Sequence, residues 1–268
     1  MGVFQNNLLA GAAAAASAGG GAFYSHQIEQ SMRFDNASDT YLTRTPSSNG
    51  NRKTWTLSFW LKLGELASVR NDTNAVFANL NSGYGWTQFQ FQNTDKIYVQ
   101  LTYATSGGKY LTADRLFRDT SAWMHFVWRV DTTQASASNR QRVYLNGTEL
   151  DYSTQQTIPQ DSDVFWNNTT AHYIGYEPTY SNHEYEGYLA EVINIDGTSL
   201  GPDSFGETKN GVWIPKDASG LTFGTNGFHL KFENASDLGN DSSGNNNDWT
   251  VNNAGADHQV LDSPTFGS

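Results

Sequence analysis

Apolar and polar residues alternate along most of the chain after residue 30, in short runs separated by turn residues. In residues 123–130, every second position is apolar: Met124, Phe126, Trp128 and Val130. A period of two is typical of a β-strand with one buried face, because successive side chains point to opposite faces of a sheet. A second alternating run ends at Asn146-Gly147, a pair suited to a two-residue hairpin turn. The pattern predicts two neighbouring strands.

The same alternation predicts further strands at short spacing. They cover residues 32–34, 54–63, 89–92, 96–103, 172–176, 187–196 and 227–232. No long segment has the 3.6-residue period of an amphipathic helix. Many short strands joined by polar loops predict an all-β domain, either a β-sandwich or a jelly roll.

Residues 8–23, LLAGAAAAASAGGGAF, consist mostly of small side chains. The alanine run favours a helix, but a helix this short is marginal alone in water, and the three glycines after it would end it. Two interpretations remain open: a flexible arm, or an anchor that packs against another subunit. The preceding residues lack the positive charge of a signal peptide. We expect an N-terminal arm (1–30), a sandwich domain (31–250) and a C-terminal tail (251–268).

Composition narrows the classes of partner. The formal net charge is −11 with only 16 lysines and arginines, which argues against binding nucleic acid through phosphate contacts. Charged residues make up 16% of the chain, so much of the surface must be uncharged Asn, Ser, Thr, Gly and Gln. No segment approaches the roughly 18 consecutive apolar residues of a membrane span. There is no cysteine, so disulfides and Cys-ligated zinc are excluded.

Five motifs occur in an order that resembles a known domain family. They are SMRFDNASDTYL, WTLSFWLK, WMHFVWRVD, VYLNGTEL and YEGYLAEVINIDG. From about residue 31 to 201 the chain resembles the laminin-G-like, concanavalin A-like lectin/glucanase domain. This resemblance implies a concanavalin A-like jelly-roll β-sandwich, in which the alternating aromatic residues of 123–130 fill the space between two sheets.

The N-terminal arm, this domain and the DSPTFGS end together resemble virion structural proteins of tailed, particularly marine, bacteriophages. The resemblance implies a fibre, adhesion module or capsid decoration on the particle exterior, anchored to other virion subunits through residues 1–30. It also implies a homo-oligomer or a place in a symmetric assembly, and a host-surface glycan as a further partner. The alternative is a free or cell-surface calcium-dependent lectin that binds polysaccharide.

Acidic pairs are candidates for catalysis because enzymes of this family cut β-glucans with two carboxylates about 5 Å apart, which residues i and i+2 of a strand can supply. The pairs are Glu149 and Asp151, Asp161 and Asp163, and Glu184 and Glu186. None has the family's Glu-x-Asp-x-x-Glu pattern, and their contexts are turn-like. His125 has no adjoining Ser or Asp constellation, so we expect it to pack. We expect no catalytic residues and a protein that is not an enzyme.

Two aromatic segments are candidates for ligand binding. They contribute Tyr84 and Trp86 in SGYGWTQ, and Tyr176, Tyr180 and Tyr185 in YEPTYSNHEYEGY. A tyrosine offers a flat apolar face with a hydroxyl, which suits stacking on a sugar ring and equally a protein interface. The alternative is that these rings are scattered over sheet edges and under loops.

An oxygen-rich segment, NDSSGNNND at residues 240–248, suggests a cation site. Calcium takes six to eight oxygen ligands. The family resemblance implies a calcium at the rim of the domain, with Asp39 and Asp241 as its ligands. The rival interpretation is a turn in which Asn, Asp and Ser bond their own backbone and need no ion.

Overall fold

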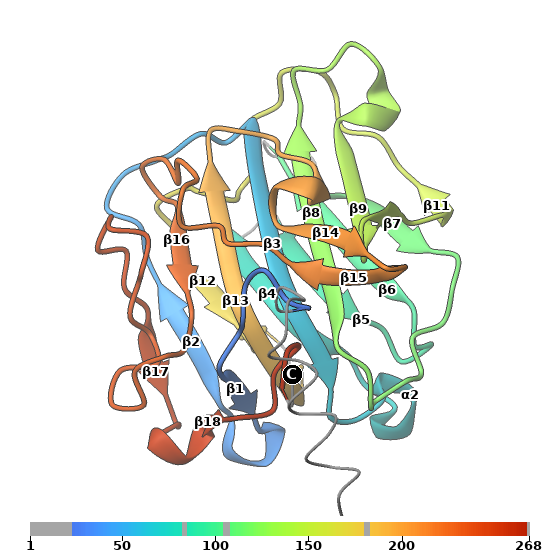
Figure 1. Cartoon of the computed structure of the whole chain (residues 1–268). Helices are drawn as coiled ribbons and strands as arrows, with labels where there is room; N and C mark the ends of the chain where they lie inside the picture. The colour runs from blue at the N-terminus through green and yellow to red at the C-terminus, as the bar shows by residue number, and fades with distance from the viewer. Residues whose placement is uncertain (1–22, 82–84, 104–107, 180–182, 267–268) are drawn as a thin grey trace, which may run out of the picture.

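A computed structural model describes residues 23–81, 85–103, 108–179 and 183–266. Within them, two eight-stranded antiparallel sheets pack face to face (Figure 1). The front sheet contains β1 (Ser31–Phe34), β3 (Thr54–Leu63), β8 (Met124–Asp131), β9 (Gln141–Leu145), β10 (Thr148–Glu149), β13 (Gly187–Asp196), β16 (Phe228–Leu230) and β18 (Gln259–Val260). The back sheet contains β2 (Tyr41–Arg44), β4 (Asn74–Asn81), β5 (Gly85–Phe91), β6 (Ile97–Thr102), β7 (Gly108–Ala113), β11 (Tyr152–Gln155), β12 (His172–Ile174) and β17 (Thr250–Asn252).

Few other elements occur in the described residues. A separate hairpin, β14 (Gly206–Lys209) and β15 (Val212–Pro215), lies over the outer face of the front sheet (Figure 1). The helices are short: α2 (Ala67–Arg70), η1 (Asn36–Ser38), η2 (Ala137–Asn139), η3 (Pro202–Ser204) and η4 (Ala256–His258). None of these helices is long and apolar enough to cross a membrane. The predicted all-β jelly-roll sandwich is confirmed.

The predicted hairpin turn is present. Asn146 and Gly147 have φ of 46° and 83° and join β9 to β10. Both residues need a left-handed conformation, which glycine and asparagine adopt more readily than other residues. Before the turn, β8 and β9 pair antiparallel, with Phe126 opposite Leu145.

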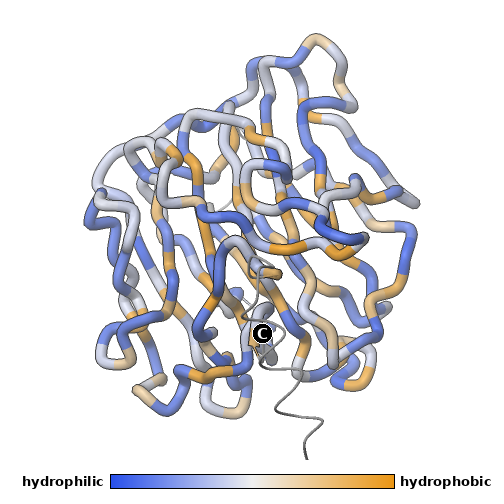
Figure 2. Tube along the Cα trace, viewed as in Figure 1, coloured by the Kyte–Doolittle hydropathy of each residue, from blue (hydrophilic) through white to orange (hydrophobic). Residues whose placement is uncertain are grey.

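Aromatic rings fill the space between the sheets. Phe59 and Phe126 of the front sheet stand 5.7 Å apart, and Phe59 lies 4.7 Å from Phe77 and 5.1 Å from Phe89 of the back sheet. All four side chains have no exposed surface. Hydrophobic and hydrophilic segments succeed each other along the strands (Figure 2). The expected packing role of the aromatic residues in 123–130 is therefore confirmed.

The sandwich extends beyond its predicted limits at residues 31 and 250. On the N-terminal side, Ile28 is only 3% exposed and packs with Trp60 and Ala190 on the outer face of the front sheet. On the C-terminal side, β17 pairs with β2 and β18 pairs with β1. These short pieces show no periodicity of their own, so the sequence pattern did not assign them to the domain. Residues 1–22 of the predicted arm lie outside the described residues, so their anchoring role stays a prediction.

Candidate functional site

A continuous row of side chains crosses the outer face of the back sheet. Each of these residues is the cross-strand neighbour of the next: Thr43, Tyr173, Ala78, Gln88, Gln100 and Tyr110. Their neighbours along the strands, such as Phe89 and Val99, belong to the core. Because side chains alternate between the two faces of a strand, the row faces outward.

Further uncharged side chains flank this row. On one side Gln90, Tyr98 and Thr112 are opposite one another, and on the other side Leu80 is opposite Trp86. Along the described parts of β2, β12 and β4 to β7, no residue at an outward position carries a charge. In a chain of net charge −11, this face is therefore a neutral surface of rings, amides and hydroxyls.

At one end of the row, Tyr98 and Tyr110 form a stacked pair. Their ring centroids are 4.9 Å apart with an interplanar angle of 30°. The Tyr98 hydroxyl donates a hydrogen bond to Gln100 Oε1 at 2.7 Å. Burial, with a contribution from Tyr110, raises the pKa of Tyr98 to about 12, so this phenol stays protonated and neutral across the physiological range. The pair provides an aromatic surface with neutral donors.

At the other end, Tyr41, Tyr173 and Tyr176 gather. Tyr41 and Tyr176 stack with centroids 4.8 Å apart, and Tyr173 lies 6.1 Å from Tyr176. Burial raises the pKa of Tyr173 and of Tyr176. Tyr176 reaches this place because the chain turns at Gly175, whose φ is 86° and whose added Cβ would lie 2.4 Å from the Phe34 ring. Four strand spacings, about 19 Å, separate Tyr173 on β12 from Tyr110 on β7.

Glutamine amides occupy the middle of the row. Gln88 and Gln90 are each only 8% exposed, so their neighbours hold them in place. Gln100 lies over Gly108, where an added Cβ would stand 2.1 Å from its Nε2 atom. A glutamine amide both donates and accepts hydrogen bonds. The row can therefore offer stacking surfaces at its ends and, between them, the partly exposed amide of Gln100, while the buried Gln88 and Gln90 shape the surface beside it.

The five aromatic residues predicted to bind a ligand do not share one location in the structure. Trp86 and Tyr176 lie on the outer face of the back sheet, on β5 and directly after β12 respectively. Tyr84 and Tyr180 lie outside the described residues. Tyr185 has no exposed surface, packs 5.8 Å from Phe34, and donates its hydroxyl to the Lys62 carbonyl at 2.8 Å. Its expected role as a ligand-binding residue is wrong, because its ring belongs to the core.

Sequence reasoning missed most of this face. The missed residues are Tyr41, Gln88, Gln90, Tyr98, Gln100, Tyr110 and Tyr173. A signal was available in TQFQF and IYVQLT, where the polar positions of alternating strands carry only Thr, Gln and Tyr. Exposed strand positions often carry charged residues such as lysine and glutamate, so the lack of charge in these two runs was the signal that this face is unusual.

The two predicted calcium ligands do not fit a shared ion. Asp39 lies before β2, where its carbonyl accepts from Asn253 at 3.0 Å. Asp241 belongs to the loop at the other end of β2, since Asn247 of that loop accepts a hydrogen bond from Arg44. Across the residues that the structure describes, no group of three or more His, Cys, Asp or Glu side chains is placed to hold a metal ion. The structure therefore does not bring Asp39 and Asp241 together as the two ligands of one calcium ion.

The carboxylate of Asp241 organises its own loop. Oδ1 accepts from the backbone N–H groups of His229 at 2.8 Å and Ser243 at 2.9 Å. Oδ2 accepts from the Ser243 hydroxyl at 2.8 Å and from the Asn247 N–H at 2.9 Å. Burial lowers the pKa of the nearby Arg44, while the charges of Asp241, Asp196 and Asp248 oppose that effect. Hydrogen-bond donors of the protein thus occupy the carboxylate oxygens that a bound ion would need, and Arg44 is a positive charge nearby. This arrangement is the one that the Asx-turn interpretation predicts.

Four of the six carboxylates in the candidate catalytic pairs have partners of their own. Glu149 pairs with Arg142 at 2.9 Å. Glu184 pairs with Arg70 at 3.5 Å, and Glu186 accepts from the Asn36 N–H at 3.0 Å. Asp161 lies 4.0 Å from the Lys53 ammonium. These contacts are structural ion pairs and hydrogen bonds.

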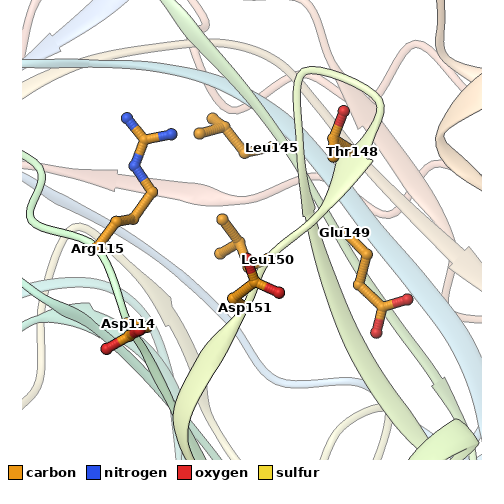
Figure 3. A pocket seen from close by; sticks show the side chains of 7 residues that line it. All are labelled: Asp114, Arg115, Leu145, Thr148, Glu149, Leu150 and Asp151. Atoms are coloured by element: carbon orange, nitrogen blue, oxygen red, sulfur yellow. The ribbon is translucent and has the colours of Figure 1, made fainter.

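Glu149 and Asp151 also line a hollow of about 270 Å³ at one end of the sandwich (Figure 3). Its other residues are Asp114, Arg115, Leu145, Thr148 and Leu150. Leu145 and Leu150 lie between Arg115 on one side and Glu149 on the other (Figure 3). The carboxylate of Asp114 lies 3.8 Å from the ammonium of Lys96, a residue that does not line the hollow. The hollow combines charged walls with two leucines and differs in character from the neutral row.

His125 and Ser58 are adjacent but do not form a catalytic dyad. The Trp213 indole N–H donates to His125 Nδ1 at 3.0 Å, so Nδ1 carries no proton. Burial lowers the pKa of His125 to about 3, so the ring is neutral with its proton on Nε2. Nε2 therefore donates to Ser58 Oγ, 2.9 Å away, and cannot accept the serine proton. The ring centroids of Trp60 and Trp213 lie 4.9 Å and 5.9 Å from that of the imidazole, which has the packing role expected for it.

Two packed antiparallel sheets and a neutral outer row define a lectin-like β-sandwich. Residues 35–196, more than half of the chain, match the concanavalin A-like lectin/glucanases superfamily. The chain belongs to this superfamily. No curated protein sequence matches it.

Solved structures with similar folds share little sequence with this chain. A heptameric SAP-like pentraxin from Limulus polyphemus is 15% identical, with TM-score 0.46 over 66% of this chain and 80% of its own. Domains LG4-5 of the mouse laminin α1 chain are 12% identical, with TM-score 0.46 over 67% and 45%. Domain 4 of an extracellular arabinanase from Geobacillus stearothermophilus, solved with arabinotriose, is 18% identical, with TM-score 0.43 over 60% and 68%.

Proposed function

We propose that this protein is a non-enzymatic binding module for neutral polysaccharide, which docks on the outer face of the back sheet. The observation that carries the proposal is the uncharged row from Tyr173 to Tyr110. Sugar rings present apolar faces that stack on aromatic side chains and hydroxyls that hydrogen-bond to amides. The row supplies both groups without a charge.

The charge of the chain favours a neutral ligand over an acidic one. A net charge of −11 repels polyanions, and the row contains no cation that would compensate. The main alternative to a glycan ligand is a protein partner, because protein interfaces also use exposed aromatic residues. The partly exposed amide of Gln100 favours the glycan, because a ligand rich in hydroxyls can hydrogen-bond to it.

The test is binding of the full chain to an array of neutral and acidic polysaccharides, followed by titration of the best ligand with and without EDTA. We expect neutral glycans to bind and EDTA to have no effect. The variant Tyr173→Ala should weaken that binding, whereas Tyr24→Ala on the opposite face should not. An array without signal for the folded protein contradicts the proposal, and binding abolished by EDTA favours the calcium-dependent lectin instead.

We propose further that the module stands on the exterior of a tailed-phage particle and is held there through residues 1–30. The resemblance to virion proteins and the largely uncharged surface support this placement. Residues 23–30 run over the outer face of the front sheet, opposite the neutral row. A subunit that holds the arm would thus leave the row open to solvent.

Peptide mapping and copy number in purified particles of the source test this placement. An intact residue 1, at a copy number fixed relative to the major capsid protein, is the expected result. A chain absent from particles, or one that begins near residue 24, would contradict the virion role and favour a secreted lectin.

A further inference from the structure

The N-terminal segment of the described chain lies across the outer face of the front sheet. Residues 23–30 pass in front of this sheet before the chain enters β1 (Figure 1). Ile28 is the buried centre of this segment, against Trp60 and Ala190. Since the segment has no regular structure, its position depends on a few side-chain contacts.

Neutral hydrogen bonds hold the segment at Ile28. Its N–H donates to Thr265 Oγ1 at 2.9 Å, and its carbonyl accepts from the hydroxyls of Thr265 at 3.0 Å and Ser263 at 2.5 Å. Next to Ser263 in the chain, Asp262 accepts hydrogen bonds from the Lys62 ammonium at 2.7 Å and from the Trp123 indole at 3.0 Å, which tie this C-terminal segment to the front sheet. The contacts made by Ile28 itself contain no group that titrates near neutral pH.

A charged cluster holds the segment at His26. His26 Nε2 lies 3.6 Å from Glu191 Oε1, while Glu191 Oε2 is hydrogen-bonded to His229 Nε2. The exposed fractions of these side chains are 18% for His26, 9% for Glu191 and 2% for His229. A separation of 3.6 Å is an ion-pair distance and too long for a hydrogen bond, so the contact depends on the charge of the imidazole.

The backbone of β13 aims Glu191 at this cluster. The pairing of β13 with β3 shifts register between Ala190 and Ile193, and Glu191 has a φ of 47°. A bulge of this kind redirects a side chain, and a left-handed glutamate costs energy that the surroundings must offset. Here the redirected carboxylate meets two histidines, His26 and His229.

The groups around His26 favour its charged form. The contact with Glu191 raises the pKa of His26; burial opposes this, Asp217 adds to it, and the charge of Lys231 works against it. Burial raises the pKa of the Glu191 carboxyl, but its contacts with His229 and His26 outweigh burial and lower it to about 2. Glu191 is therefore ionised throughout the neutral range, and His26 is the group of this pair that titrates there.

We propose that residues 23–27 form a strap which the charge of His26 holds on the front sheet, and that loss of this charge releases the strap while Ile28 stays clasped. A raised pKa means that the hold is complete below the ordinary pKa of histidine, near 6.5, and is lost as pH rises through the raised value. Two further strap contacts lie at exposed positions: Ser25 donates to Glu207 at 3.0 Å, and the Lys209 ammonium lies 5.7 Å from the Phe23 ring. Release would change how the N-terminal arm leaves the domain, independently of glycan binding.

Amide hydrogen exchange of the full chain between pH 5.5 and 9 tests the strap, with each rate divided by the intrinsic rate at that pH. We expect the protection of residues 24–27 to fall severalfold as pH rises, while residues 29–34 keep theirs. In His26→Gln the strap should be unprotected at every pH. In His26→Lys it should be protected up to pH 9, because lysine stays charged until about 10.4.

The control is Ser25→Ala, which removes a neighbouring strap contact without changing the charge of His26. It should keep the pH dependence of the unmodified chain. Constant protection of the unmodified chain across the range would overturn the proposal. Undiminished pH dependence in His26→Gln would overturn it as well, since the titrating group would then be elsewhere.

Discussion

Tyr98 and Tyr110 lie ring on ring on the outer face of the back sheet, with centroids 4.9 Å apart on adjacent strands. The Tyr98 hydroxyl donates a hydrogen bond to Gln100, and Tyr110 is the last residue of the neutral row, opposite Gln100. A stacked pair in this position is a preformed surface, because neither ring must be ordered when a ligand arrives.

Tyr110→Ala is expected to weaken neutral-glycan binding by about 1 kcal/mol, roughly fivefold in Kd, which is the typical contribution of one aromatic contact. The fold should persist, since Tyr110 is only partly buried. Titration calorimetry of the variant beside Tyr24→Ala measures the difference. Equal affinities for the two variants would remove Tyr110 from the site.

Tyr185→Phe should cost about 1 kcal/mol of unfolding free energy, because the Lys62 carbonyl loses the hydroxyl donated to it at 2.8 Å. Tyr185→Ala should cost about 3–5 kcal/mol through the cavity it leaves. Urea unfolding measures both, and glycan affinity of the folded variants should stay unchanged. Normal stability together with lost glycan binding would show that Tyr185 is a ligand-binding residue and contradict its role in the core.

Asp241→Asn should destabilise the protein by about 2 kcal/mol. The substitution turns one of two fully used acceptor oxygens into a donor that faces N–H or O–H groups. The melting temperature of the unmodified chain should be the same in EDTA and in calcium. A calcium-dependent rise in Tm that Asp241→Asn abolishes would show that the carboxylate binds the ion.

Acid should weaken the fold through Glu191. Its folded pKa of about 2 lies below the ordinary value of 4.5, so its stabilisation is present above pH 4.5 and is lost as pH falls toward 2. For this nearly buried group the loss is on the order of 3 kcal/mol. Urea unfolding between pH 2.5 and 7 should show a shallower acid decline in Glu191→Gln than in the exposed control Glu207→Gln. Identical declines would contradict the assigned role.

Alternation along the chain predicted the strands well, because a buried face imposes a period of two on each strand that contributes to the core. The run from Trp55 to Leu61 and the run from Met124 to Val130 pair with each other and bury their apolar positions between the sheets. The Asn146-Gly147 turn followed from local backbone preference. In each case the information is local to the residues concerned.

The candidate site was only partly predictable, since it depends on which strands become neighbours. Tyr41 and Tyr176 are far apart in sequence yet stacked, because β2 pairs with β12 and the chain turns at Gly175. Tyr185, only nine residues after Tyr176, is directed into the core instead. A tyrosine in a loop has no period from which its burial can be read.

The sequence by itself determined the all-β class, the aromatic core and the neutral composition of the surface, because these follow from periodicity and residue type. Only the tertiary structure decided that Gln88, Gln100 and Tyr110 form one row, and that Asp39 and Asp241 stand at opposite ends of β2. Cross-strand register sets such proximities, and register arises from contacts between residues distant in the chain.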